Sequence, residues 1–261
     1  MYKEGQLTEY LQDIRMRVLR IAIFAGLVTV LCMTFSISIF DFNGYKIPLP
    51  NPSPLNNLAT QIIHSMQENL LPKNVRLIQV TPQGAFLTQI YVAGLIGIIL
   101  AVPIAIRELA AFVGPALYQN EKSIMKKIAT PAIGLFAIGC LFSYFVVIPY
   151  TLSFLYKYGE SIGVSTFFNV TEFIPFVMQL LIAFGFSYQF PLIMWAITLL
   201  NIVEPKFWRN NFRYIIIILV ILGAIIAPDG SGITMWFVAG PMILLYLIGM
   251  LFIGWKIKRE T

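Results

Sequence analysis

The chain has 261 residues, of which 58% are hydrophobic and only 11% charged, and its mean hydropathy is +0.80. This number of charged residues is too small to cover the surface of a soluble domain. The composition therefore excludes a soluble globular protein and indicates an integral membrane protein. The 18 Lys and Arg residues outnumber the 12 Asp and Glu residues, which gives a formal net charge of +6 at pH 7.

Long apolar runs mark the candidate membrane spans, because a helix of about 20 apolar residues crosses about 30 Å of hydrocarbon and satisfies its own backbone hydrogen bonds. The last apolar run is interrupted at 227–232 by Pro, Asp and two Gly residues, which predict a turn between two helices. We therefore predict an all-α polytopic membrane protein with six spans. They lie at 21–40, within 77–106, at 128 to about 156, at 173–203, and as two helices within 214–255.

The orientation of the spans follows from the positions of Lys and Arg, which are enriched in cytoplasmic segments. Of the 18 basic residues, 14 lie in the N-terminal segment, the second and fourth connections and the C-terminal tail. The opposite face carries Lys46, Lys73, Arg76 and Lys157. We expect both termini to be cytoplasmic, and the positive charge then records topology rather than binding of nucleic acid.

The connections contain two expected helices outside the spans. Residues 1–20 place apolar side chains at helical spacing opposite charged ones, which predicts an amphipathic helix on the cytoplasmic interface. The outer loop of 41–82 begins with a proline-rich extended stretch, and a short lid helix follows, with Ser53 as the expected cap and Pro54 in its first turn. We expect 1–261 to form a single membrane domain.

The fifth span is short. Counted over 214–227 it would be about 21 Å long at 1.5 Å per residue, against about 30 Å of hydrocarbon. We expect either local thinning of the bilayer or a water-filled concavity beside this helical hairpin, and hence a concave bundle.

Motifs for catalysis or metal binding are absent from the sequence. It has no HExxH, no G-x-S-x-G, no phosphate-binding loop and a single histidine, His64. This favours a protein that is not an enzyme and has no cofactor or metal. A solute or ion transporter remains an alternative. Such proteins typically have charges at the bilayer midplane or broken helices in matched halves, and neither is evident in the sequence.

Glu121 is the acidic residue that stands out in the first cytoplasmic connection. It follows an aromatic and small-residue stretch, 112–118, which could hold its carboxylate against the membrane surface. A partly desolvated carboxylate attracts a guanidinium group strongly, and Arg can bind it through two hydrogen bonds. From this loop alone, a surface ion pair with Lys122 or Lys126 is the simpler interpretation.

Five segments carry a family resemblance when they are taken together and in order. They are YLQDIRMRVL at 10–19, AFVGPALYQNEK at 111–122, CLFSYFVVIP at 140–149, FGFSYQFP at 184–191 and APDG at 227–230. Together they resemble the TatC family, the receptor subunit of the twin-arginine protein translocase. The resemblance implies recognition of signal peptides with paired arginines on the cytoplasmic side, and export of folded proteins across the cytoplasmic membrane with the proton motive force. It also implies TatA- and TatB-like single-span partners and a homo-oligomer within the complex.

The resemblance also implies roles for individual residues. The residues that it implies for signal-peptide binding are Glu121, Phe112, Asp13, Arg15, Arg17, Pro115, Leu117 and Tyr118. Those that it implies for structural roles on the outer side are Pro48, Pro228 and Asp229. Pro54 is a rival to Pro48 for the family's outer-loop proline.

Three departures from the family pattern matter. Tyr10 and Asp13 replace the family His and Glu, and Ala227 stands where Thr or Pro is usual. Gln189 occupies the position of the family's intramembrane glutamate, and a glutamine cannot release a proton. We therefore expect Gln189 to act by hydrogen bonding, either to a partner helix or signal-peptide backbone, or within the bundle itself.

Overall fold

The computed structural model describes residues 2–42, 45–72, 75, 77–113, 119–164, 167–199, 202–227 and 232–260. For 2–10, 39–42, 45–48, 110, 113, 119–128, 233 and 255–260, only the backbone is described. The chain divides into two compact units, one of 1–116 with 165–178 and one of 117–164 with 179–261.

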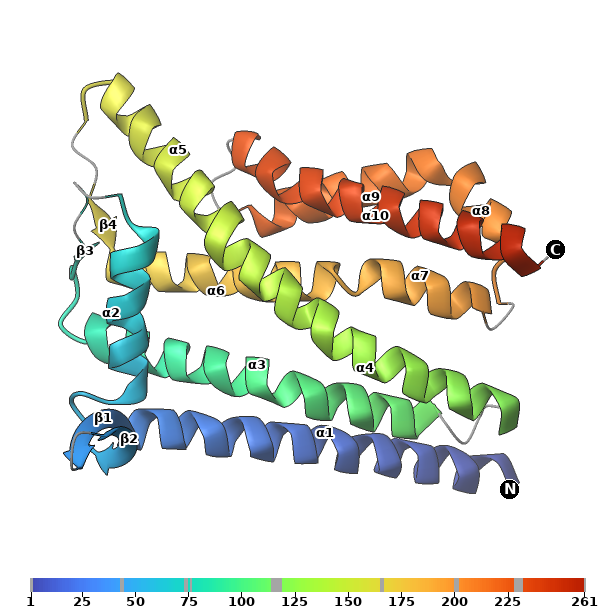
Figure 1. Cartoon of the computed structure of the whole chain (residues 1–261), viewed down its shortest axis with the longest axis horizontal. Coiled ribbons are helices and arrows are strands. Elements are labelled where there is room, and N and C mark those ends of the chain that lie inside the picture. The colour runs from blue at the N-terminus through green and yellow to red at the C-terminus, as the bar shows by residue number, and fades with distance from the viewer. Residues whose placement is uncertain are drawn as a thin grey trace. The chain divides into compact units, whose positions relative to one another are not determined.

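Helices dominate both units, as predicted (Figure 1). Among the described residues, five helical segments are long and apolar enough to cross a membrane: Leu11–Thr34, Gly84–Leu109, Ala129–Ser161, Val170–Leu199 and Thr234–Gly254. A sixth, shorter apolar helix spans Phe212–Ile226. The prediction of six spans with a short fifth is confirmed, since 15 residues make a helix of about 22 Å.

The first unit is built on two long helices, α1 (Tyr2–Thr34) and α3 (Gly84–Val113), which lie side by side (Figure 1). Gly97 permits their close approach, because a Cβ atom there would lie 2.5 Å from the carbonyl oxygen of Ala25 and 2.6 Å from Thr29 Oγ1. The predicted amphipathic N-terminal helix is not a separate element, since α1 continues without a break into the first span.

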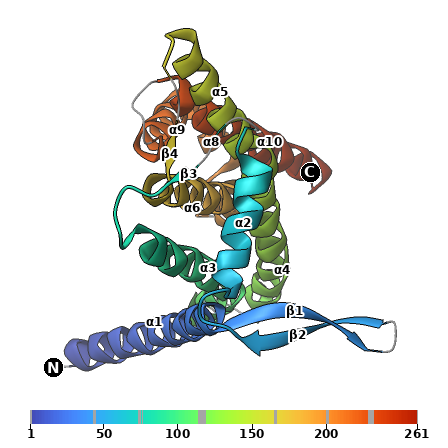
Figure 2. The ribbon, with the colours of Figure 1, turned by 90° about the vertical axis from the view of Figure 1, so that its left-hand side faces the viewer.

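The outer connection of the first unit corrects the sequence prediction. The helix ends at Thr34 rather than near Phe40, and β1 (Phe35–Phe42) pairs antiparallel with β2 (Tyr45–Pro52) in a hairpin shown in Figure 2. The extended conformation expected of the proline-rich stretch is confirmed in β2. A second small sheet, of β3 (Leu77–Ile78) and β4 (Phe168–Asn169), is parallel. The fold is therefore mostly, but not wholly, α-helical.

The lid helix is α2 (Leu58–Leu70), and its cap is Asn57 rather than Ser53. Asn57 Oδ1 accepts a hydrogen bond of 2.9 Å from the backbone N–H of Thr60, as N-cap residues do. Its Nδ2 donates to the carbonyl of Met33 at the end of α1 and to Gln89 Oε1 on α3. Asn57 is 1% exposed, so it ties three helices together at the outer end of this unit.

The second unit begins with a long helical segment that contains one irregularity. It runs through α4 (Gln119–Phe142), a π-helical stretch at Ser143–Val147 and α5 (Ile148–Ser161). In the π-helical stretch the N–H of Ile148 donates to the carbonyl of Ser143, five residues back. Pro149 follows directly and has no N–H to donate, which disturbs the regular α-helical pattern here.

The fourth span is interrupted between α6 (Val170–Ser187) and α7 (Phe190–Leu199). Pro191 cannot donate to the carbonyl of Ser187, so the helix breaks at Tyr188 and Gln189. The N–H of Gln189 instead bonds the carbonyl of Phe186, three residues back.

The last helices are α8 (Pro205–Asn210), α9 (Phe212–Ile226) and α10 (Ile233–Glu260), and α10 packs against α7 and α9 (Figure 1). Gln179 Nε2 donates to the carbonyl of Ile226, the last residue of α9, so the short helix has a partner for its C-terminal end. Gly232 has a φ of +68°, a conformation that favours glycine.

Candidate functional site

The candidate site in the first unit lies at the cytoplasmic end of α1 and α3. Asp13, Arg17 and Arg20 are spaced four and three residues apart, so they share one face of α1, and that face meets α3. Glu108 and Phe112 are four residues apart and share a face of α3. Two helical faces therefore supply five side chains to one cluster.

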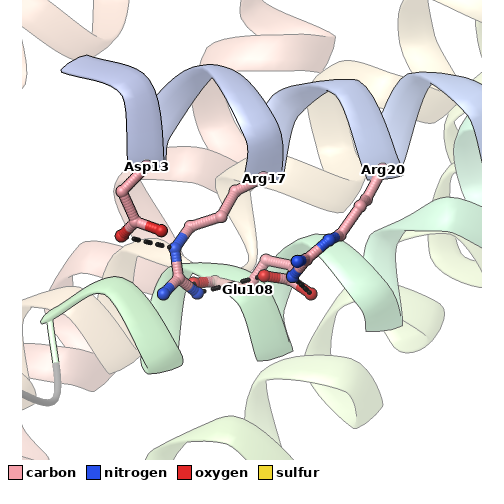
Figure 3. Close-up of polar contacts among 4 residues, drawn as sticks. All are labelled: Asp13, Arg17, Arg20 and Glu108. Atoms are coloured by element: carbon pink, nitrogen blue, oxygen red, sulfur yellow. Dashed lines mark hydrogen bonds and ion pairs between the residues drawn. The ribbon is translucent and has the colours of Figure 1, made fainter. Parts of the chain in front are cut away.

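The guanidinium group of Arg17 is at the centre of this cluster (Figure 3). Its Nε donates to Asp13 Oδ2 at 2.9 Å, and its Nη1 donates to Glu108 Oε2 at 3.0 Å and to the Glu108 backbone carbonyl at 3.2 Å. Arg20 Nη1 lies 3.6 Å from the other carboxylate oxygen of Glu108. One guanidinium thus links an acid on its own helix to an acid on the neighbouring helix.

The aromatic ring of Phe112 completes the cluster. The Cζ atom of Arg17 lies 6.0 Å from the centre of this ring, which is within the range of a cation–π contact. Arg17 and Phe112 therefore lie together in the structure, as the family resemblance implied for two residues of one site.

The two ion pairs of Arg17 differ in their exposure to solvent. The side chains of Arg17 and Glu108 are 19% and 15% exposed, whereas Asp13 is 48% exposed. Water screens the pair with Asp13 more than the pair with Glu108. Of the two ion pairs, the one with Glu108 therefore contributes more to the contact between α1 and α3, and Asp13 mainly orients the guanidinium.

The electrostatic state of the cluster limits what it can bind. Both carboxylates are already compensated by Arg17 and Arg20, so neither is a free anion. A second guanidinium could replace one of these arginines by exchange, because the hydrogen bonds lost and gained are of the same kind. Net attraction of a dication needs a further carboxylate that is not already paired.

The remaining residues assigned from the family resemblance are placed as follows. Arg15 is exposed and makes no ion pair among the described side chains. Pro115, Leu117 and Tyr118 lie outside the described residues. Glu121 lies in the first turn of α4, and its side chain also lies outside the described part of the chain.

Glu108 and Arg20 were not singled out from the sequence. Glu108 pairs with Arg17, and its side chain is shielded from solvent. The signal that could have found it is its spacing of four residues from Phe112, which puts both on one helical face. Arg20 is likewise one helical turn from Arg17.

Gln189 makes a hydrogen bond within its own unit. Its Nε2 donates to the carbonyl oxygen of Ala132 on α4 at 3.0 Å, from the break between α6 and α7. Of the two roles predicted for this side chain, the structure provides the partner for the one within the bundle. An ionised carboxylate at this position could not make the same bond, because it has no proton to donate.

On the outer side, Pro48 lies in β2 opposite Ile39. Pro228 and Asp229 lie outside the described residues, while Ala227 follows the end of α9 with an extended backbone. Pro54 accepts a hydrogen bond from Asn57 Nδ2 at its carbonyl oxygen.

Metal ligation finds no support in the described part of the chain, where no group of three or more His, Cys, Asp or Glu side chains is placed to hold an ion. The cytoplasmic cluster is a balanced set of charges that holds the guanidinium of Arg17 beside the ring of Phe112.

Comparisons with known proteins identify the family of the chain. The family described as Sec-independent protein translocase protein (TatC) matches residues 9–241. The TatC protein of Cenarchaeum symbiosum (strain A) is 49% identical over 257 residues, covering 98% of this chain and 97% of the relative. That of Aquifex aeolicus (strain VF5) is 31% identical over 255 residues, covering 97% and 96%. A crystal structure of the twin-arginine translocase receptor TatC matches with a TM-score of 0.75 and 26% identity, covering 94% of this chain and 97% of that one. The chain belongs to the TatC family of Sec-independent protein translocase proteins, and it is a multi-pass integral membrane protein.

Proposed function

We propose that this chain is the receptor subunit of a twin-arginine translocase, binding signal peptides with paired arginines at its cytoplasmic end so that folded proteins can cross the cytoplasmic membrane. The proton motive force supplies the free energy for the crossing. Family membership supports this function over the solute or ion transporter considered from the sequence. The observation that carries the binding role is the cluster of Arg17, Asp13, Glu108 and Phe112.

The cluster and Glu121 have different tasks in this proposal. Asp13 and Glu108 are compensated by arginines of the chain itself, so they fix Arg17 beside Phe112 and hold α1 against α3. Glu121, nine residues after Phe112, supplies the uncompensated carboxylate that the first arginine of the signal peptide engages. The apolar part of the peptide next to its arginines contacts Phe112, Pro115, Leu117 and Tyr118. Arg15 lies at the edge of this site.

The remaining features follow from family membership and from the sequence. We propose that the chain acts without catalysis or cofactor, as one membrane domain of 1–261 in which α6 continues from the first unit into the second. Its partners are TatA- and TatB-like single-span subunits, further copies of itself and the surrounding lipid, and nucleic acid is not among them. Pro48, Pro228 and Asp229 shape the outer connections.

Crosslinking tests the binding role. A signal peptide carrying a photoreactive group beside its arginine pair is added to membrane vesicles containing the native chain or Glu121→Ala, in Arg-Arg and Lys-Lys forms. We expect strong crosslinking only for the native chain with Arg-Arg. Glu160→Ala, which removes an exposed acid of the outer connection, is the matched control and should behave as the native chain does. Equal crosslinking in all combinations would reject the proposed site.

A further inference from the structure

A pocket in the second unit lies far from the cytoplasmic cluster along the chain and has no part in the proposed function. It has a volume of about 410 Å³. Its lining residues are Pro149, Tyr150, Ser153, Phe154 and Lys157 from α5, and Phe237 from α10. The five residues of α5 lie on one side of the helix, because two adjacent pairs, 149–150 and 153–154, are four residues apart and Lys157 follows one turn later.

The topology places this pocket in the outer leaflet. With cytoplasmic termini, α5 runs outward to its end at Ser161, and α10 starts at the outer side with Ile233. Lys157 is four residues from the end of α5, about 6 Å along its axis, and Pro149 is twelve residues from it, about 18 Å. The cation therefore lies at the depth of lipid head groups, and the other end of the pocket lies at the depth of acyl chains.

Aromatic rings give the pocket a fixed wall. The rings of Phe154 and Phe237 are 5.9 Å apart at 57°, which joins α5 to α10, and Phe154 also stacks on Tyr158 at 6.2 Å. Tyr150, by contrast, is 66% exposed, so this end of the pocket opens sideways to the surrounding lipid.

The charge at the other end of the pocket has no ion-pair partner among the described side chains. Lys157 is exposed, and no carboxylate of the described residues forms an ion pair with it. It is also one of few basic residues on the outer face, where Lys and Arg are depleted. A compact ammonium group attracts a phosphate as a point charge, and the Ser153 and Tyr150 hydroxyls can donate hydrogen bonds below it.

We propose that this pocket binds one anionic phospholipid of the outer leaflet, with its phosphate on Lys157 and an acyl chain along Phe154, Tyr150 and Pro149. Such a lipid matches the pocket in charge and in polarity. Its phosphate and its acyl chain follow each other along the membrane normal in the same order as Lys157 and the apolar lining of the pocket. A free phosphate ion would use only Lys157 and leave the apolar length of the pocket unfilled. A bound lipid would also fill the space between α5 and α10.

Native mass spectrometry of the purified full chain tests this proposal, with phosphatidylglycerol and phosphatidylcholine of identical acyl chains as probes. We expect one tightly retained phosphatidylglycerol per chain and a clear preference over phosphatidylcholine. Lys157→Gln should reduce that preference about fivefold, the effect of one lysine at an anionic lipid surface. Ser153→Trp, which keeps the charge and fills the pocket, should lower retention of both lipids.

Lys206→Gln is the control, because it removes an exposed lysine of the same unit on the cytoplasmic side. It should leave the retained phosphatidylglycerol unchanged, and circular dichroism should show the same helix content in all variants. Equal retention of the two lipids by the native chain would overturn the proposal. So would an unchanged preference in Lys157→Gln, or displacement of the lipid by inorganic phosphate at millimolar concentration.

Discussion

Gly97→Ala is expected to separate the two helices that carry the cytoplasmic cluster. The added Cβ atom would lie 2.5 Å from the carbonyl oxygen of Ala25 and 2.6 Å from Thr29 Oγ1, whereas ordinary contacts of a Cβ atom start near 3.4 Å. Since one of these neighbours is backbone, α1 itself has to move. Thr29 Oγ1 donates to the same Ala25 carbonyl at 2.8 Å, so its movement also disturbs that hydrogen bond.

The magnitude follows from two opposed effects. Overpacking of this kind lowers the free energy of unfolding by about 1–3 kcal/mol. Gly94→Ala on the same helix is the control, because nothing lies within 4 Å of a Cβ atom there. Removing a glycine from a helix interior without a clash raises stability by about 0.5–1 kcal/mol. Both variants gain from the loss of a helical glycine, so they should differ by the overpacking cost alone, about 1–3 kcal/mol.

Unfolding of the purified chain by sodium dodecyl sulfate in mixed micelles, followed by circular dichroism, measures this difference. Binding of a twin-arginine signal peptide, measured on the same preparations, reports whether the cluster is displaced as well. We expect Gly97→Ala to lose affinity and Gly94→Ala to keep it. If Gly97→Ala were as stable as Gly94→Ala, the close packing of α1 on α3 would be wrong.

Substitutions at three other positions, Gln189, Asn57 and Arg17, test separate parts of the structure. Gln189→Leu should lower the free energy of unfolding by about 0.6–1.7 kcal/mol through loss of the bond to Ala132, while Ser187→Ala, which removes a bond only within α6, should cost less. Gln189→Glu can donate to Ala132 only while protonated, so its stability should fall as the pH rises, and a pH-independent variant would contradict this role. Asn57→Asp keeps the cap on α2 but loses the donors to Met33 and Gln89, so hydrogen exchange should show faster opening at the end of α1 than in the native chain. Arg17→Lys keeps the charge but cannot reach Asp13 and Glu108 together, so peptide affinity should fall as far as in Glu108→Gln; an unchanged affinity in both would remove the cluster from the site.

The helical architecture was predictable because membrane spans need long apolar runs, and such runs can be recognised directly in the amino-acid sequence. The hairpin at Phe35–Pro52 was missed although the sequence marks it, because 35–40 were counted as part of an apolar run. Ser36 and Ser38 alternate with apolar residues, and Asn43-Gly44 is a typical sequence for a two-residue hairpin turn. The cap at Asn57 was missed for a different reason. Ser53 also fits a helix start, and only the contacts of Asn57 with α1 and α3 decide between them.

The candidate site was predictable in part. Asp13, Arg17 and Phe112 do lie together, as their family positions implied. The pairing that neutralises Asp13 was not predictable, because it depends on Glu108, which lies 91 positions from Arg17 in the chain. Gln189 shows the same limit, since its partner Ala132 contributes a backbone carbonyl, a group that every residue has.

The affinities of Arg-Arg and Lys-Lys signal peptides for the purified native chain and for Glu121→Gln test the proposed recognition most directly. Two charge-assisted hydrogen bonds to one carboxylate should favour Arg-Arg over Lys-Lys by roughly tenfold or more in the native chain. In Glu121→Gln the two dissociation constants should become nearly equal. A preference for Arg-Arg that survives the substitution undiminished would show that the paired arginines are read by other residues.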